Sequence, residues 1–274
     1  MTSYVRMQLD FATPTGAHRL AFAFDRSKPV QAAMHDALAS DALYEPETSL
    51  LLASVLKPGD VFIDVGAHVG YYTVLAAALV GPGGKVLSFE PAPVNYAHLI
   101  EHIRVNAVRH VLPLHCAAGD TEVVVDLHLN ADNDGGHALW DVRRHRDNVK
   151  SREAPRTHPV FVTTLDRVSC AVAPGRVKAI KIDVEGNEHA VLRGAQRLLA
   201  EHRVPFVIAE VNRDALRALG SSEEGLRAYM AELGYDTWLL QPAEPQLRRL
   251  EPGQTLEGNF VFNVLFRRPD AVIG

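Results

Sequence analysis

The sequence has few cysteines and no long apolar stretch, and so lacks the features typical of disulfide-rich secreted proteins, zinc-binding proteins and membrane proteins. Its two cysteines, Cys116 and Cys170, stand in apolar surroundings without a partner at metal-binding spacing. Disulfide frameworks and zinc sites are therefore not indicated, and we expect two buried free thiols in a reducing compartment. The longest apolar stretch, Val74–Val80, is too short to cross a bilayer, and no apolar signal core is evident near the N-terminus. We expect a cytoplasmic protein without a membrane partner.

Positive charge is also in short supply. The chain has 28 lysines and arginines against 33 acidic residues, which gives a net charge of −5. This balance argues against a protein that grips nucleic acid through bulk charge. The sequence lacks an Asn-Pro-Pro-Tyr-like motif and an aromatic-plus-basic stripe, so nucleic acid is not expected as a partner. With 274 residues and 47% hydrophobic content, the chain can form one large α/β domain.

A dinucleotide fingerprint, Gly-x-Gly-x-x-Gly, is absent, but a related turn is present. An apolar strand is predicted at 61–65 and a helix at 69–80, with Gly66 and Gly70 in the turn between them. A strand, a glycine turn and a helix together bring a cofactor against backbone amides. His68 stands where the second glycine of the fingerprint would be, so the turn suits a pyrophosphate poorly.

The acidic residues around this turn indicate a different cofactor. Asp64 precedes the first glycine and can pair with the ammonium of an amino acid moiety. A second buried strand, predicted at 85–90, closes with Glu90, and a carboxylate at that distance from the turn fits two ribose hydroxyls. Together these residues predict a site for S-adenosyl-L-methionine.

Strands and helices alternate through most of the chain, which indicates a mainly parallel sheet. Residues 1–57 are predicted to form an N-terminal cap with two strands and two helices, too small to be independent. The core domain is expected at 58–274. Further strands are predicted at 111–116, 121–129, 160–164, 177–184, 206–211, 235–240 and 259–266, and further helices at 94–107, 187–200 and 222–233.

A polar loop interrupts this rhythm at about 130–157. Long loops in compact domains are often functional, and we expect this one to cover the active site. It contains His137, a candidate general base, because histidine titrates near neutral pH. Its basic segment, Arg143–Arg156, is either a solvated loop or a grip for an anionic acceptor such as a phosphorylated sugar. His189 is a weaker candidate base outside the loop.

A second acidic motif follows the strand at 177–184. Asp183 and Glu185 are two residues apart, so they share one face of an extended strand, and Glu210 ends the next strand. Ligands of open α/β sheets bind at these carboxyl ends. Three interpretations remain open. The acids orient substrate or act as a base, they bind a divalent cation such as magnesium through all three residues, or they only cap the turn.

The motifs now in hand resemble those of the FkbM family of S-adenosylmethionine-dependent methyltransferases, over about Tyr44 to Phe266. His68 departs from the family pattern, which usually has asparagine there. The matching stretches are Phe62-Ile63-Asp64-Val65-Gly66-Ala67-His68-Val69-Gly70-Tyr71-Tyr72, Phe89-Glu90-Pro91-Ala92-Pro93-Val94-Asn95, Thr164-Leu165-Asp166 and Lys181-Ile182-Asp183-Val184-Glu185-Gly186-Asn187-Glu188.

The resemblance implies a class I methyltransferase fold, Rossmann-like, with a mostly parallel seven-stranded sheet and an antiparallel edge strand. It implies methyl transfer to a hydroxyl of a sugar or secondary metabolite. It also implies two groups of cofactor contacts. Asp64, Gly66, His68, Gly70 and Tyr71 would line the methionine end, and Glu90, Pro91, Asn95, Ala117, Ala118 and, less directly, Asp120 would hold the ribose and adenine, with Glu47 as an outer contact and Asp183 near both ligands.

Other functions remain as alternatives. N-methylation of a small amine needs less base assistance than O-methylation. A catalytically silent cofactor-binding protein is a second alternative, which the retained acids disfavour. An NAD-dependent dehydrogenase is disfavoured by the missing glycine fingerprint. The N-terminal hairpin strands are compatible with a homodimer.

Overall fold

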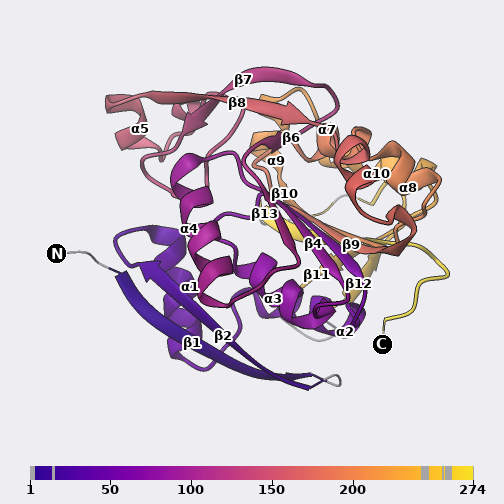
Figure 1. The fold of residues 1–274 in the computed structure, drawn as a ribbon. Coiled ribbons are helices and arrows are strands. Elements are labelled where there is room, and N and C mark those ends of the chain that lie inside the picture. Colours follow the sequence, from indigo (N-terminus) through magenta and orange to yellow (C-terminus); the bar gives the residue numbers. More distant parts are fainter. Residues whose placement is uncertain (1–3, 14–15, 242–246, 255, 257–260, 274) are drawn as a thin grey trace.

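The computed structural model describes residues 4–13, 16–241, 247–254, 256 and 261–273, and its centre is a mixed sheet (Figure 1). Eight strands of the described chain form this sheet, in the order β12-β11-β13-β10-β9-β3-β4-β5. Their bounds are β3 Val61–Val65, β4 Lys85–Phe89, β5 Val111–Leu114, β9 Val177–Ile182, β10 Phe206–Asn212, β11 Asp236–Leu240, β12 Leu247–Leu250 and β13 Val261–Arg267.

The strand directions confirm the predicted class I methyltransferase fold. Strands β5, β4, β3, β9 and β10 are parallel neighbours. The last strand, β13, is antiparallel, but it lies between β10 and β11 rather than at the edge. The edge is β12, which pairs antiparallel with β11 and was not predicted. The described sheet therefore has one strand more than expected. Residues 259 and 260 of the predicted last strand lie outside the described part.

Side chains alternate between the two faces of the sheet, as a strand buried on both faces requires. Phe62 packs with α2 (Pro46–Val55) and α3 (Tyr71–Val80), whereas the adjacent Ile63 packs with helices on the opposite face. That second layer contains α7 Glu188–Arg193, α8 Gln196–Ala200, α9 Arg213–Ala218 and α10 Glu223–Glu232. The short helices α6 Leu165–Val168, η2 Ser169–Ala171 and η3 Pro174–Arg176 precede β9.

The single helix predicted at 187–200 is two helices, α7 and α8. The break lies at Gly194, where a Cβ atom would stand 1.9 Å from the carbonyl oxygen of Gly119. Close backbone packing, not local propensity, ends the first helix. The short helix α9 was not predicted. Its N-cap is Asn212, whose side chain accepts from the backbone amide of Ala215.

The N-terminal segment packs on the same core as the sheet. Strands β1 (Tyr4–Thr13) and β2 (Gly16–Asp25) form a hairpin, which lies beside α4 (Pro93–Val105) at the lower left of Figure 1. Phe22 and Phe24 belong to the apolar cluster of α3. The helix α1 (Pro29–Ala39) follows. This shared core is what a dependent cap requires.

A small three-stranded sheet lies above the main one. It consists of β6 Ala117–Ala118, β8 Arg156–Thr163 and β7 Val123–Leu129, in that order. The polar loop between β7 and β8 carries η1 Val142–Arg144 and α5 Val149–Glu153. Cys116 is buried as expected, but Cys170 is exposed, which corrects that prediction. No helix among the described residues is long and apolar enough to cross a membrane.

Candidate active site

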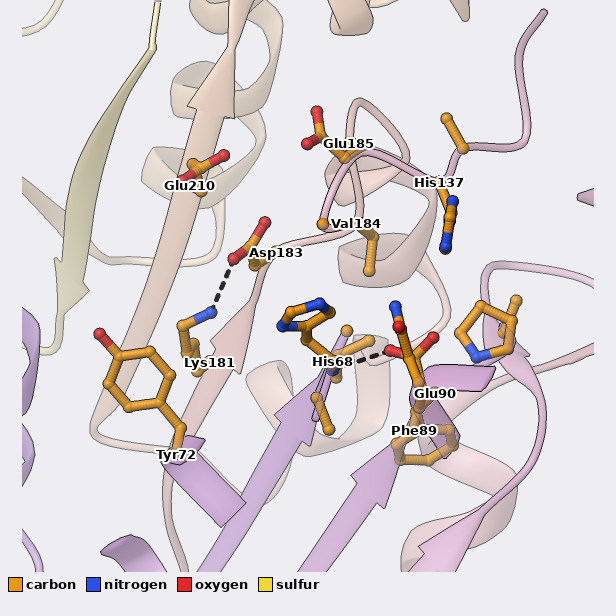
Figure 2. Close-up of a pocket in the computed structure, with 18 of the residues that line it drawn as sticks. His68, Tyr72, Phe89, Glu90, His137, Lys181, Asp183, Val184, Glu185 and Glu210 are labelled. Carbon is orange, nitrogen blue, oxygen red and sulfur yellow. Dashed lines mark hydrogen bonds and ion pairs between the residues drawn. The ribbon is translucent and has the colours of Figure 1, made fainter. Parts of the chain in front are cut away.

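One cavity lies at the carboxyl ends of β3, β4, β9 and β10, where a parallel sheet is expected to bind its ligand (Figure 2). The turns after these strands, the strand β6, the polar loop and the residues before α2 form its walls. Most of the predicted site residues meet there. Those lining the cavity are Gly66, His68, Tyr71, Glu90, Pro91, Asn95, Ala117, Ala118, His137, Asp183, Glu185 and Glu210.

The turn after β3 needs its first glycine for a structural reason. Gly66 has a φ of +81°, and a Cβ atom there would lie 1.8 Å from the carbonyl oxygen of Asp183. Only glycine permits this approach of two backbones, and the same contact brings the two acidic motifs together. His68 follows with a φ of 51°, a left-handed conformation that is uncommon outside glycine and asparagine.

Glu90 stands at the cofactor end of the cavity, on the right of Figure 2. Its carboxyl oxygens accept backbone N–H groups from His68 and Ala92, each at 2.8 Å. Burial raises the pKa of Glu90 to about 8, against the lowering effect of these two hydrogen bonds. In the ionised form each oxygen keeps one lone pair for a further donor, so the carboxylate can accept two ribose hydroxyls.

Three of the predicted cofactor contacts have other roles. Asp64 does not line the cavity. It is fully buried and accepts a hydrogen bond from the Thr73 hydroxyl at 2.6 Å. Gly70 is the αL N-cap of α3, where a Cβ atom would meet Leu99 at 2.5 Å. Tyr71 lines the cavity, but its ring is buried in the core. These residues support the structure around the cavity and do not offer polar groups to a ligand.

Small and apolar residues line the part of the cavity formed by β6. Ala117 and Ala118 are buried in β6, and the Asn187 side chain donates to the Ala118 carbonyl at 2.9 Å. Asn95 lines the cavity, yet its amide nitrogen donates to the Asp134 carbonyl at 2.9 Å. Asp120 lies outside the cavity, in an ion pair with Arg193 at 2.7 Å.

At the opposite end, the charged residues cluster around Lys181, on the left of Figure 2. Its side chain is 3% exposed, and its ammonium pairs with Asp183 at 2.9 Å. Burial opposes the charge of Lys181, but the carboxyl groups of Asp183, Glu45 and Asp64 outweigh it and raise its pKa. The ammonium also lies 4.7 Å from the centre of the Tyr72 ring. We call Glu45, Tyr72, Lys181, Asp183, Glu185 and Glu210 the acidic end.

Two other carboxyl groups of the acidic end favour the protonated form. Burial, together with the charges of Asp183 and Glu188, raises the pKa of Glu185 to about 8. The charge of Asp183, followed by burial, raises the pKa of Glu210 well above its usual value. Glu185 has a φ of 53°, and its carboxyl oxygen accepts from the Asn212 side chain at 3.2 Å. One ion-paired carboxylate thus lies among neutral carboxyl groups.

The structure argues against His137 as the general base. Its Nδ1 accepts the backbone N–H of Asn130 at 2.9 Å, so Nε2 carries the proton of the neutral ring. Burial lowers the pKa of His137 to about 4, which keeps the ring neutral. Its remaining nitrogen can donate a hydrogen bond but cannot accept a proton. His189 is remote from the cavity and contacts the Ser221 hydroxyl at 2.8 Å.

Two residues of the acidic end were not predicted. Glu45, rather than the predicted Glu47, reaches the cavity and accepts from the Tyr72 hydroxyl at 2.7 Å. Pro46 was a usable signal, because a proline is favoured at the first position of a helix and so places Glu45 at the N-cap of α2. Lys181 could also have been recognised as a site residue, because a charged side chain there lies between Ile180 and Ile182 of a buried strand.

The basic segment Arg143–Arg156 does not reach the cavity. Arg143 pairs with Asp141 at 2.7 Å, and Arg152 donates to the backbone carbonyls of His145 and Arg146. The arginines of this segment are not among the cavity-lining residues, so the expected grip on an anionic acceptor has no structural support. Among the described residues, no group of three or more His, Cys, Asp or Glu side chains is arranged to hold a metal ion.

Comparison with known proteins places the chain in a family. The model of the methyltransferase FkbM domain matches residues 64–237. The chain is 34% identical over 206 residues to the 31-O-demethyl-FK506 methyltransferase FkbM of Streptomyces tacrolimicus, covering 64% of this chain and 73% of that protein. It is 29% identical over 149 residues to Methyltransferase 1 of Beauveria bassiana, covering 50% and 59%.

Among solved structures, methyltransferase FkbM from Methylobacillus flagellatus aligns at 16% identity with a TM-score of 0.49. That alignment covers 76% of this chain and 43% of the other. The family match spans both acidic motifs and the turn that joins them. The family model and the 34% identical relative show that this chain belongs to the FkbM family of methyltransferases.

Proposed function

We propose that this protein uses S-adenosyl-L-methionine to methylate a hydroxyl of a small acceptor, such as a sugar or a secondary metabolite. The proposal depends on one observation: a single cavity has a carboxyl group suited to a ribose at one end and a carboxylate suited to an acceptor at the other. Glu90 offers two oxygens for ribose hydroxyls at one end, and Asp183 offers an ion-paired carboxylate at the other. The name of the Streptomyces relative, an O-demethyl substrate methyltransferase, supports oxygen as the acceptor atom.

The residues of the cofactor end fit this ligand. Glu90 would hold the ribose, while Ala117 and Ala118 leave room for a flat ring system. The apolar walls of Phe89, Leu127 and Leu139 would exclude water from it. When bound, the cofactor supplies an electrophilic methyl group on a sulfonium. The chain must then align the acceptor and receive its proton.

Asp183 is the residue we assign as general base. Its Oδ2 is held by Lys181, which leaves Oδ1 for the acceptor hydroxyl. Asp183 would receive the proton of that hydroxyl when the hydroxyl oxygen takes the methyl group from the sulfonium, which leaves as a neutral thioether. Glu185 and Glu210, held neutral, can donate hydrogen bonds that orient other acceptor hydroxyls. A positioned base contributes about 10²–10⁴-fold in rate.

Lys181 makes a divalent cation unnecessary for this arrangement. Its ammonium already supplies the positive charge that Asp183 faces. Asp183, Glu185 and Glu210, the three candidate magnesium ligands, are therefore assigned to the acceptor.

Calorimetric titration with S-adenosyl-L-methionine, with magnesium and then with EDTA, tests the proposal. We expect binding that EDTA does not weaken. Failure of the folded, cofactor-free protein to bind at millimolar ligand would overturn it. Mass spectrometry of a panel of polyhydroxylated acceptors, after incubation with labelled methyl donor, would then find the substrate. The methyl-transfer rate of the Asp183→Asn variant should be about 10²-fold or more below that of the wild type.

N-methylation is a second candidate, favoured by one observation. The acidic end has four carboxyl groups, Glu45, Asp183, Glu185 and Glu210, against one lysine. This excess can attract an ammonium group, whose proton Asp183 would remove before methylation. Fragmentation of the methylated product distinguishes a methyl group on nitrogen from one on oxygen.

A further inference from the structure

The polar loop contains a compact segment, Asn130–Leu139, which we call the lid segment. Its two ends are joined by hydrogen bonds in both directions between His128 and Ala138, at 2.8 and 3.2 Å. Inside it, the Asn130 side chain accepts the backbone amides of Asp132 and Asn133. The segment is thus braced internally and can move as a unit.

The lid segment forms one wall of the cavity. Its residues Asn133, Gly135, His137, Ala138 and Leu139 all line it. They face the end that contains Glu90 and Asn95. A ligand held at that end would therefore be covered by this segment.

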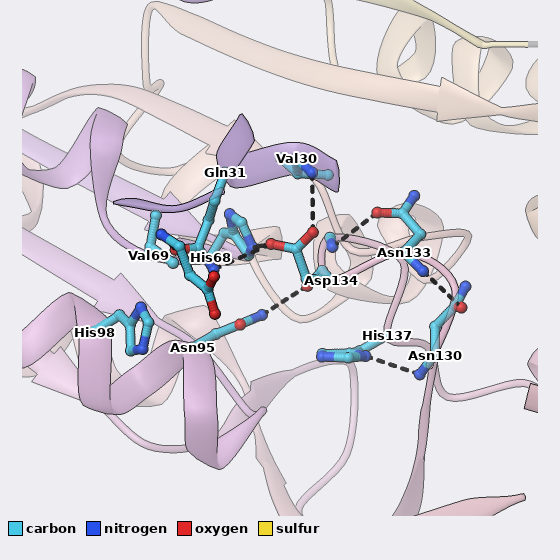
Figure 3. Close-up of polar contacts among 12 residues, drawn as sticks. Val30, Gln31, His68, Val69, Asn95, His98, Asn130, Asn133, Asp134 and His137 are labelled. Atoms are coloured by element: carbon cyan, nitrogen blue, oxygen red, sulfur yellow. Dashed lines mark hydrogen bonds and ion pairs between the residues drawn. The ribbon is translucent and has the colours of Figure 1, made fainter. Parts of the chain in front are cut away.

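Asp134 attaches the tip of the lid segment to the rest of the protein, through its carboxylate and through its backbone carbonyl, which accepts from the Asn95 side chain (Figure 3). One oxygen of Asp134 accepts the backbone N–H of Val30 at 2.9 Å. The other accepts from the Gln31 side chain at 3.2 Å and pairs with Nε2 of His68 at 3.1 Å. Asp134 is 6% exposed, so water does not readily replace these partners.

These partners come from two separate parts of the site. Val30 and Gln31 belong to α1, and His68 belongs to the turn that also donates to Glu90. Despite burial, the His68 ring and the α1 donors lower the pKa of Asp134 to about 2. The carboxylate thus ties the lid segment directly to the cofactor turn.

We propose that Asp134 is a positioning residue: it latches the lid segment over the cofactor end, and breaking the latch lets bound cofactor escape. The proposal rests on the proposed function, because it assumes that an adenosyl ligand binds there. Asp134 acts through the lid segment, which carries the Nε2–H donor of His137 into the cavity.

The test is the dissociation rate of S-adenosylhomocysteine, followed by stopped-flow fluorescence after displacement. Trp140 is a suitable reporter, since it follows the lid segment and its indole N–H donates to the Glu185 carbonyl at 2.8 Å. Asp134→Asn places a donor against Gln31 and His68, and we expect dissociation at least tenfold faster. His68→Asn leaves the α1 contacts intact and should accelerate dissociation about threefold.

Asp141→Asn is the matched control. Asp141 lies in the same polar loop, and Arg143 likewise lowers its pKa to about 2, but its carboxylate pairs with Arg143 of that loop rather than with α1 or His68. We expect a dissociation rate within twofold of the wild type. Equal rates for the Asp134 and Asp141 variants would overturn the proposal. If Asp134→Asn fails to fold, as judged by circular dichroism, Gln31→Ala removes one donor without a charge, and an unchanged rate there would count against the latch.

Amide hydrogen exchange of the ligand-free protein separates the latch from the proposed function. Asp134→Asn should raise exchange at the amide of Val30, which donates to the Asp134 carboxylate across the latch. Exchange unchanged from the Asp141 control would overturn the latch even if the ligand binds. Raised exchange in a protein that binds no adenosyl ligand would support the latch and remove the cofactor proposal.

Discussion

The two ends of the cavity are built in different ways. At the cofactor end, Glu90 lies 22 residues beyond His68 in sequence, and both belong to consecutive strand–turn units. At the acidic end, the charges come from three distant segments, represented by Glu45, Lys181 and Glu210. The first end can be recognised from local spacing. The second depends on charge balance, which exists only once the chain has folded.

This difference predicts that mutations at the acidic end mainly reduce stability, whereas mutations at the cofactor end mainly reduce ligand binding. The largest effect is expected at the acidic end. Lys181→Met leaves the carboxyl groups of Asp183, Glu45 and Asp64 without their cation, so the free energy of unfolding should fall by about 3–5 kcal/mol. Chemical denaturation measures it. Lys178→Met is the control on the same strand, because Lys178 contacts only the Phe206 ring at 5.2 Å. A similar loss in both variants would contradict the proposed charge balance.

The cofactor end should show its effect in binding. Glu90→Ala removes the acceptor for two ribose hydroxyls, and each such hydrogen bond contributes about 0.5–1.5 kcal/mol. We expect affinity for S-adenosylhomocysteine to fall about 10- to 100-fold in calorimetry. Glu101→Ala, which affects only an exposed pair with Arg104 on α4, should bind normally. Unchanged binding by the Glu90 variant would remove it from the cofactor site.

At both ends of the cavity, a carboxyl group with a raised pKa makes the unfolding free energy depend on pH. The folded pKa values of Glu90 and Glu185, both about 8, lie above the usual 4.5. Their stabilising contribution is therefore fully present below pH 4.5 and is lost as the pH rises toward 8. The unfolding free energy of the ligand-free protein should decline between pH 5 and 8, by at most about 1.4 kcal/mol per pH unit for each group. A Glu90→Ala variant should show a flatter decline, and equal slopes would contradict the raised pKa of Glu90.

The smallest effect concerns one hydroxyl of the acidic end. Tyr72→Phe removes the 2.7 Å hydrogen bond to Glu45 and should cost about 1 kcal/mol of stability. Tyr229→Phe is a suitable control, because its hydroxyl makes a marginal 3.5 Å contact with the Leu192 carbonyl. A Tyr72 variant as stable as that control would show that Glu45 does not depend on this bond.

Some of the site could be predicted because its signals are local. The strand at 61–65, Gly66 and Glu90 lie within short stretches whose spacing reflects one strand–turn–helix unit after another. Asp183 and Glu185 were predicted to stand at the end of a parallel strand, and both line the cavity. Asp64 was predicted to pair with the cofactor's ammonium, but it does not line the cavity, because a side chain in a fully buried strand faces the core on either side.

The sequence by itself determined the mainly parallel character of the sheet and the carboxyl-end edge where the acids gather. Apolar runs and turn residues are sufficient for this, since burial follows from local pattern. Only the tertiary structure decided the roles of single side chains. Lys181 pairs with Asp183, which directly follows the same strand, but Glu45 joins them across the fold, and Asn130 makes His137 a donor instead of a base. Such roles depend on desolvation and on hydrogen-bond partners that are distant in sequence, so no local pattern contains them.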